Sequence, residues 1–118
     1  MQFATACAVE NDKKRVEMSG FLSPGRNVFC SNRSGRMECG YRFAEKPDAG
    51  KGITAYIEQG TGANTADKLK SSYKREDVKI RDHNGNLVNL TDQLKLTGKL
   101  SVTPDLSACF IDGSRIER

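Results

Sequence analysis

The segment Leu94–Val102 constrains the fold more than any other part of this chain, because its apolar residues alternate strictly with polar ones. Alternation with a period of two is typical of a strand with one buried face. Val16–Ser23 follows the same pattern, and each segment carries a glycine near its middle, Gly20 and Gly98. A glycine inside a strand marks a bend or a closely approaching backbone. Two strands bent at their centres are typical of a small closed barrel.

A hairpin is predicted where Ser34-Gly35 provides a two-residue turn. This register places Cys30 opposite Cys39 at non-hydrogen-bonded positions, where Cα atoms lie roughly 4.5 Å apart. That separation suits a disulfide, so we predict a bond between Cys30 and Cys39. A coincidental pair of thiols is the alternative.

A second hairpin and one helix are predicted in the middle of the chain. Asp82–Gly85 fits a type I turn whose glycine adopts the left-handed conformation, and it pairs residue 80 with residue 88. Residues 65–75 are predicted to form a short helix, because Ala66, Leu69 and Tyr73 follow helical spacing.

The last hairpin determines the expected partner of the remaining cysteines. A turn over residues 103–106 places Cys109 opposite Leu100, on the apolar side. Cys7 lies on an arm with no turn signal of its own, and such an arm stays loose unless something ties it down. We therefore predict a bond between Cys7 and Cys109 that closes a loop of about 100 residues. The alternative is a buried thiol at Cys109 and an exposed or lipidated Cys7.

The cysteine pattern also predicts the compartment. The four cysteines form no C-x-x-C pair of the kind a structural zinc site uses. A disulfide framework indicates an oxidising compartment, so we expect a periplasmic or secreted protein in its mature form, without its signal peptide. Ala4–Cys7 faintly resembles a lipoprotein cleavage box, which makes a lipoprotein the alternative.

Size and charge exclude several classes of protein. The 118 residues suffice for one domain, expected over residues 13–118 after an N-terminal arm over residues 1–12. A chain that is 36% hydrophobic and 29% charged is too apolar and too balanced to be disordered. No segment contains the roughly 20 apolar residues of a membrane helix. The net charge of +4 fits a mixed, solvated surface and does not require a polyanionic partner.

Four segments resemble small OB-fold domains of bacterial envelopes, in particular the bacterial OB-fold and tRNA-anticodon-like OB groups. Val16–Ser23 resembles the bent first strand, Val78–Leu90 a hairpin of the barrel, Leu94–Ser101 the fourth strand and Cys109–Glu117 the fifth. The resemblance implies a mostly β protein: a small five-stranded OB-like antiparallel barrel, with an extra hairpin and one short helix. Residues 24–76 depart from the usual order, in which the helix directly precedes the fourth strand.

The sequence contains no recognisable catalytic, metal or cofactor motif. Gly60-Thr61-Gly62 precedes the predicted helix as a phosphate-binding loop would, but no Gly-Lys-Ser/Thr follows it. His83 lies in a polar turn, and the aspartates are spread over loops and strand ends without a recognisable spacing. We therefore expect a protein that is not an enzyme and has no cofactor.

Basic residues interleaved with aromatic ones are the candidate ligand-binding residues. This mixture is typical of surfaces that bind single-stranded nucleic acid, although the three aromatic residues suit the core equally well. We expect a non-catalytic extracytoplasmic binding or interaction module whose partner is a protein, a glycan or an envelope component. A single-stranded nucleic-acid-binding OB-fold protein is the alternative. The candidates are Arg26, Phe29, Arg33, Arg36, Tyr41, Arg42, Lys70, Tyr73, Lys74, Lys79 and Arg81.

Overall fold

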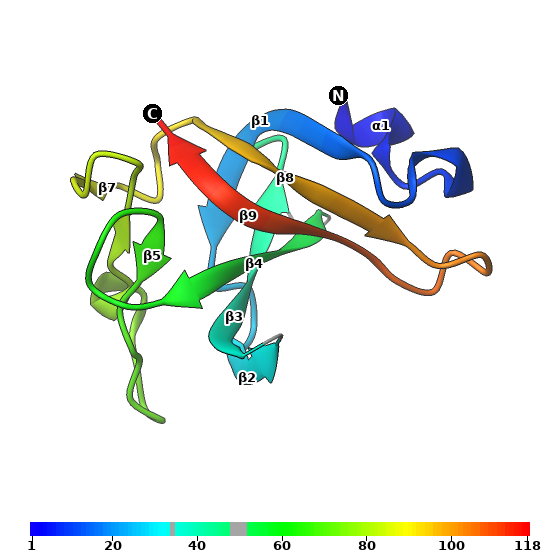
Figure 1. The fold of residues 1–118 in the computed structure, drawn as a ribbon. Helices are drawn as coiled ribbons and strands as arrows, with labels where there is room; N and C mark the ends of the chain where they lie inside the picture. The colour runs from blue at the N-terminus through cyan, green and yellow to red at the C-terminus, as the bar shows by residue number, and fades with distance from the viewer. Residues whose placement is uncertain (34, 48–51) are drawn as a thin grey trace.

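The computed structural model describes residues 1–33, 35–47 and 52–118, and these fold around a closed five-stranded barrel (Figure 1). β1 pairs with β3 and β8, while β9 pairs with β8 and β4, and the β3–β4 pairing closes the ring. The order around the barrel is therefore β1-β3-β4-β9-β8. Its strands are β1 (Arg15–Ser23), β3 (Arg36–Ala44), β4 (Ile53–Gln59), β8 (Leu94–Val102) and β9 (Cys109–Glu117).

The barrel is mixed, which corrects the antiparallel barrel expected from the sequence. β4 and β9 run parallel, with Tyr56 paired to Asp112, whereas the other neighbours in the ring are antiparallel. The reason is geometric. Strand directions cannot alternate around a closed ring with an odd number of strands, so at least one neighbouring pair must be parallel.

The structure confirms three of the barrel strands expected from the sequence and replaces the other two. β1, β8 and β9 coincide with the predicted first, fourth and fifth strands. The second and third barrel strands are β3 and β4, not the Val78–Leu90 hairpin. That hairpin consists of the short strands β6 (Ile80–Arg81) and β7 (Leu87–Val88), which lie beside the barrel. Residues 24–76 thus hold the missing barrel strands, in an OB-like order.

The predicted helix over residues 65–75 is wrong. Thr65–Ala66 forms β5, which pairs with β4 and β6, and the 3-10 turn η2 (Arg75–Asp77) is the helical part of this region. Sheet pairing and tertiary contacts override the helical spacing. The Tyr73 hydroxyl accepts a hydrogen bond of 3.0 Å from the backbone N–H of Val28, and Leu69 packs against the core.

The hairpins that join β2 (Phe29–Arg33) to β3 and β6 to β7 have the predicted registers. β2 pairs with β3 so that Cys30 faces Cys39, and a disulfide joins them with Cα atoms 4.0 Å apart. Ser34, the first residue of the predicted turn, lies outside the described residues. In the second hairpin the N–H of Asp82 donates to the carbonyl of Asn86, and Gly85 has a φ of +82°.

The last hairpin is shifted by two residues from the prediction. Cys109 pairs with Val102 instead of Leu100, because the Thr103 N–H donates to the Ala108 carbonyl across a longer loop. A shift of two residues keeps each side chain on its face of the strand. Cys109 therefore still meets Cys7, and the two form the predicted disulfide with a sequence separation of 102.

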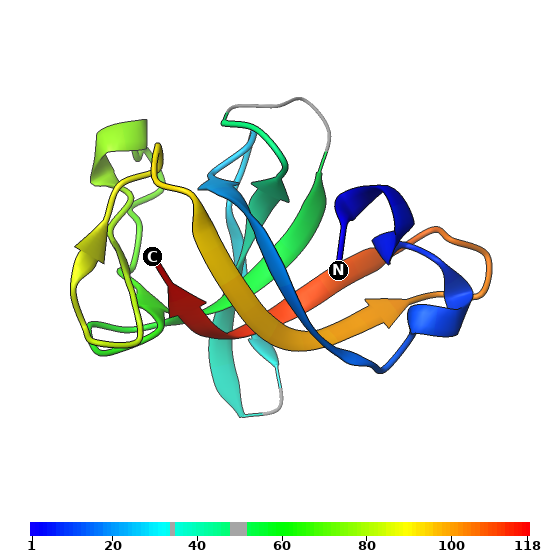
Figure 2. The ribbon, with the colours of Figure 1, turned by 90° about the horizontal axis from the view of Figure 1, so that it is seen from above.

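The N-terminal arm is held against the barrel (Figure 2). It consists of α1 (Phe3–Ala6) and the 3-10 turn η1 (Val9–Asn11). The Phe3 ring lies 5.1 Å from that of Phe43, and Ala6 is completely buried.

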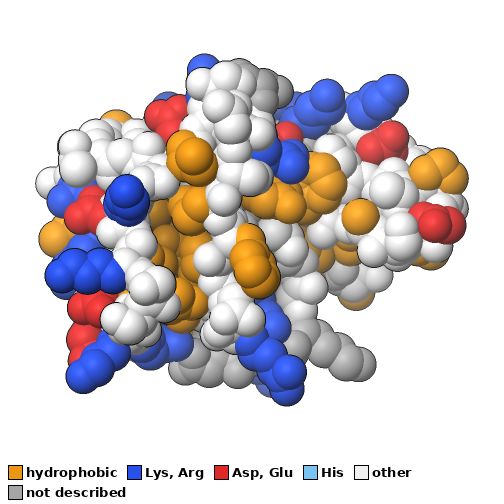
Figure 3. All heavy atoms as spheres, turned by 90° about the horizontal axis from the view of Figure 1, so that it is seen from below, with side chains coloured by type: hydrophobic (Ala, Val, Ile, Leu, Met, Phe, Trp, Pro, Cys, Tyr) orange, Lys and Arg blue, Asp and Glu red, His pale blue; other side chains and the backbone are white. Residues whose placement is uncertain are grey.

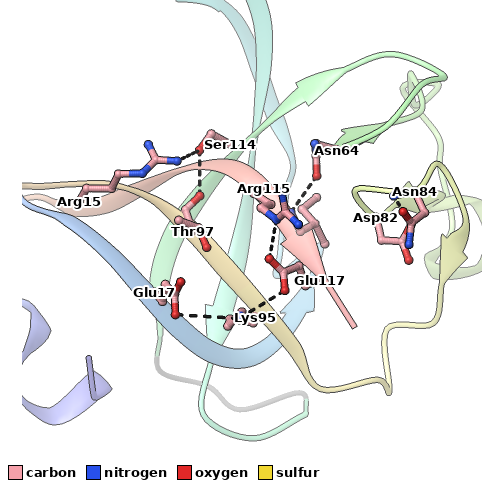
Figure 4. A network of polar contacts seen from close by, with 11 residues as sticks. Arg15, Glu17, Asn64, Asp82, Asn84, Lys95, Thr97, Ser114, Arg115 and Glu117 are labelled. Carbon is pink, nitrogen blue, oxygen red and sulfur yellow. Dashed lines mark hydrogen bonds and ion pairs between the residues drawn. The ribbon is translucent and has the colours of Figure 1, made fainter.

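Polar contacts join β9 to strands β1 and β8 and to the segment that follows β4 (Figure 4). Ser114 Oγ donates to the Thr97 carbonyl on β8 and accepts from Arg15 on β1. The Ile116 N–H donates to Asn64 Oδ1 at 2.8 Å, so the segment between β4 and β8 is fastened to the end of β9.

Candidate binding face

One solvent-facing side of the barrel gathers aromatic and charged side chains from four strands. Phe29, Gly40, Tyr56 and Asp112 form one cross-strand row over β2, β3, β4 and β9. Residues opposite each other in neighbouring strands point to the same side of the sheet. We call this side the outer face. Its side chains are Phe29, Arg33, Arg36, Glu38, Arg42, Thr54, Tyr56, Glu58, Phe110 and Asp112.

The centre of the outer face is a guanidinium lying on two aromatic rings. The Arg33 Cζ atom is 3.9 Å from the centroid of Tyr56 and 5.0 Å from that of Phe110. The two rings meet edge to face, with centroids 5.1 Å apart. Arg33 also pairs with Glu38 at 3.1 Å and with Asp112 at 3.6 Å. Two rings and two carboxylates therefore fix a planar cation whose side chain is still 31% exposed.

Two hollows flank this platform, and their charges differ. The first, about 730 Å³, is lined by Arg33 and Arg36 together with carboxylates, and Arg36 pairs with Glu58 at 3.6 Å. The second, about 610 Å³, is lined by Arg26, Phe29, Arg42 and Tyr56. Among the described residues no carboxylate lines the second hollow. We call the first the compensated hollow and the second, after its two arginines, the cationic hollow.

Five of the predicted ligand-binding residues lie on this face or at its rim. Arg26, Phe29 and Arg42 line the cationic hollow, and Arg33 and Arg36 line the compensated one. Phe29 is a surface residue, with 75% of its area exposed.

Tyr41 is a core residue, which corrects its place among the candidates. Its side chain points to the interior with Cys39 and Phe43, and only 1% of its area is exposed. Burial, with smaller contributions from Tyr73 and Asp67, raises the pKa of Tyr41 to about 12. Its hydroxyl is buried without a hydrogen-bond partner among the described residues.

The second predicted cluster does not join the outer face. Arg81 pairs with Asp67, and Lys79 Nζ donates to the Glu76 carbonyl at 3.3 Å. Lys79 lines a separate hollow beside β7. Lys70 and Lys74 are exposed, and Tyr73 is half-buried with its hydroxyl bonded to Val28. Arg81, Lys79 and Tyr73 thus make contacts within the segment between β4 and β8 or from it to Val28.

The outer face also contains residues that were not predicted from the sequence: Tyr56, Phe110 and the carboxylates of Glu38, Glu58 and Asp112. A signal for Tyr56 was present, because Ile53, Ala55 and Ile57 alternate with Thr54, Tyr56 and Glu58. The parallel pairing that brings Phe110 beside this strand had no such signal.

The carboxyl groups with lowered pKa values are not among the outer-face residues. The pKa values of Asp82, Asp105 and Glu117 are lowered, and these residues lie in turns or at the end of β9. Among the described residues, no three His, Cys, Asp or Glu side chains are placed to hold a metal ion.

No known family, no curated protein and no solved structure matches this chain. Within the described ranges, no helix has both the length and the apolar character needed to cross a bilayer.

Proposed function

We propose that this chain is a non-catalytic extracytoplasmic binding module of OB-like build that binds its partner through the outer face. The observation that carries the proposal is the Arg33 guanidinium fixed on Tyr56 and Phe110 beside the exposed Phe29. Aromatic and arginine side chains are enriched at binding surfaces, and a fixed platform loses little conformational entropy when a partner binds.

The charges of the outer face favour a partner that is itself polar and mixed in charge. Glu38, Glu58 and Asp112 lie among the arginines, so a polyanion entering the compensated hollow would meet carboxylates. A protein surface, a glycan or another envelope component can instead stack on the rings and hydrogen-bond to both kinds of charge.

The disulfides support the proposed compartment. Both bonds need an oxidising environment to persist, which agrees with a periplasmic or secreted protein, and a lipid at Cys7 is incompatible with its bond to Cys109. The OB-like strand order supports membership of the bacterial envelope OB group proposed from the sequence.

The cationic hollow favours one alternative, binding of single-stranded nucleic acid. Arg26 and Arg42 stand beside Phe29 and Tyr56 there, and bases stack on such rings while phosphates contact the arginines. Binding of this kind would weaken steeply with salt.

A nuclear magnetic resonance titration with three probes tests these proposals. The probes are a murein disaccharide-peptide, an uncharged oligosaccharide and an oligothymidylate of about ten nucleotides, at low and at physiological salt. We expect amide shifts at Tyr56 and Phe110 with a glycan probe, and their loss in the Tyr56→Ala variant. Shifts with oligothymidylate alone would favour the alternative. Binding that leaves the outer face unperturbed would contradict both.

A further inference from the structure

β2 is an open edge of the sheet. It is the terminal strand in the order of the sheet and pairs only with β3 among the described strands. Four of its five residues are exposed. Natural edges are often blunted by proline or lysine, and β2 contains neither. Apart from Arg33 at its end, β2 carries none of the residue types that protect sheet edges.

The outward hydrogen-bonding groups of β2 belong to Cys30 and Asn32. Paired positions alternate along the hairpin, and the short Cα separation at Cys30–Cys39 is that of a non-hydrogen-bonded pair. The N–H and C=O groups of Cys30 and Asn32 thus point away from β3. No hydrogen bond between them and another described residue is present. The outward N–H of Val28, two residues earlier, already donates to the Tyr73 hydroxyl.

A groove lies beside this edge, on the side of the hairpin opposite to the outer face. It measures about 600 Å³ and is lined by Cys30 and Met37 from the hairpin and by Gln59, Gly60, Thr61 and Lys68 from the facing segment. Met37 is 43% exposed. Seen from the side on which β2 lies, hydrophobic side chains gather near the centre of the surface, with charged side chains of both signs around them (Figure 3).

The charge along the groove favours an acidic occupant. Lys68 lines the groove without an ion pair to a described residue, Lys70 follows it, and no carboxylate among the described residues lines the groove. An added strand would turn alternate side chains toward Met37 and could place acidic ones beside Lys68.

We infer that β2 and its groove form a docking site for an extended acidic peptide segment of a partner protein, which adds to the sheet as a strand. This goes beyond the proposed function, because it uses the opposite side of the hairpin and backbone hydrogen bonds rather than the aromatic platform. The Cys30–Cys39 bond holds the edge in its strand conformation before the peptide arrives.

Fluorescence anisotropy with a labelled peptide of about seven residues that alternates glutamate and valine tests the inference. We expect saturable binding to the intact, oxidised chain. The same peptide with N-methyl groups on alternate residues should bind at least about tenfold more weakly, since it cannot complete the ladder. Equal binding of the two peptides would overturn the inference.

Two variants of Asn32 separate the edge hydrogen bond from the stability of the turn. Asn32→Pro removes the outward N–H without touching the ladder to β3, as proline does on edge strands. It should weaken binding at least about tenfold. Asn32→Ala also loses the bond from the Gly35 N–H to Asn32 Oδ1, but keeps the backbone N–H. It should stay within about twofold of wild type, and equal losses in both variants would contradict strand addition.

A charge reversal in the groove provides a test that leaves the strand untouched. Lys68→Glu should weaken binding of the glutamate peptide and strengthen binding of a lysine–valine peptide, whereas Lys99→Glu on β8 has the same net charge and should do neither. Equal effects of both reversals would indicate general electrostatics and overturn the site. So would a dimer of the chain alone that Asn32→Pro dissociates, because a second copy would then occupy the edge.

Discussion

Two facing glycines allow β8 and β9 to cross closely at one point of the barrel. Gly98 pairs with Gly113 next to an irregularity in the register after Thr97. A Cβ atom built on Gly98 would collide with the carbonyl oxygen of Asp112. The mid-strand glycine is therefore required by backbone contact, as expected for a strand that bends to close a small barrel.

Gly98→Ala should lower the free energy of unfolding by at least about 2 kcal/mol, because the new methyl group meets backbone that cannot move aside cheaply. Urea denaturation measures the change. Gly62→Ala is the matched control: its Cβ meets nothing within 4 Å, and the change should stay within about 0.5 kcal/mol. A similar stability for both variants would show that the backbone near Gly98 can move aside to admit a methyl group.

Asp82 fixes the turn between β6 and β7 through its carboxylate. Its Oδ1 accepts hydrogen bonds from the N–H groups of Asn84 and Asn86 at 2.9 and 3.0 Å. Burial alone would raise the pKa of this carboxyl, but the two donors, aided by His83 and Arg118, hold it below its ordinary value of 3.8. The charged form is thus favoured by folding.

The Asp82→Ala variant should lose about 1–3 kcal/mol of stability at neutral pH, and Asp82→Asn, which keeps an oxygen acceptor, should lose less. Because the pKa is lowered on folding, the contribution of the charge is present above pH 3.8 and disappears as the pH falls through the folded-state pKa. The stability gap between wild type and Asp82→Asn should therefore shrink in acid. Denaturation at a series of pH values checks this, and a constant gap would contradict it.

At the scale of elements, side-chain contacts of Arg33 attach the tip of the β2–β3 hairpin to the barrel; we call this hairpin the hairpin arm. Arg33 closes the hairpin opposite Arg36 and reaches back over Tyr56 and Phe110. The disulfide holds the base of the same arm. Both the outer face and the edge of β2 depend on where this arm lies.

Arg33→Ala should cost about 0.5–1.5 kcal/mol and speed amide exchange at the hairpin tip, because the cation–π contacts and two ion pairs are lost together. Arg36→Ala is the control. Its side chain is 70% exposed with one ion pair of 3.6 Å, and exchange should hardly change. Native-state hydrogen exchange distinguishes the two, and equal effects would mean that Arg33 does not fasten the arm.

Elements whose signal is local were predictable from this sequence. The alternation in 94–102 and the turns at Gly35 and Gly85 led to the correct strands and registers. The helix predicted for residues 65–75 does not form, because β5 pairs with β4 and β6 and the Tyr73 hydroxyl bonds to Val28. Two of these partners, β6 and Val28, are distant in the sequence, so no local pattern indicated them.

The candidate site could be predicted only in part, since its centre depends on pairing between distant strands. Arg33 and Phe29 were found from composition, but Phe110 reaches Tyr56 through the parallel pairing of β4 with β9. No local pattern records that pairing. A closed ring with an odd number of strands must contain at least one parallel pair, but this rule does not say which two strands form it.

Over the whole molecule, two covalent bonds of very different span hold the chain together. The Cys7–Cys109 bond has a sequence separation of 102 and ties the N-terminal arm to β9, whereas the Cys30–Cys39 bond spans 9 residues within one hairpin. In the chain-entropy model, the loss of unfolded-state freedom grows with the logarithm of the loop length. The long loop should contribute roughly 4–5 kcal/mol and the short one about 2–3 kcal/mol.

Replacing both cysteines of the long loop (Cys7→Ser with Cys109→Ser) should therefore destabilise the chain by about 2 kcal/mol more than replacing both cysteines of the short loop (Cys30→Ser with Cys39→Ser). Thermal and urea unfolding without reductant measure the two losses. The long-loop variant should also show faster amide exchange over residues 3–11, because α1 and η1 are then held by noncovalent contacts, among them the Phe3–Phe43 ring contact, the burial of Ala6 and the hydrogen bond from the Val102 N–H to Asp12 Oδ1. Adding reductant to wild type should narrow its gap to each variant. Equal losses of stability in the two variants would show that packing rather than the disulfide holds the N-terminal arm. So would amides of residues 3–11 that stay protected from exchange without the Cys7–Cys109 bond.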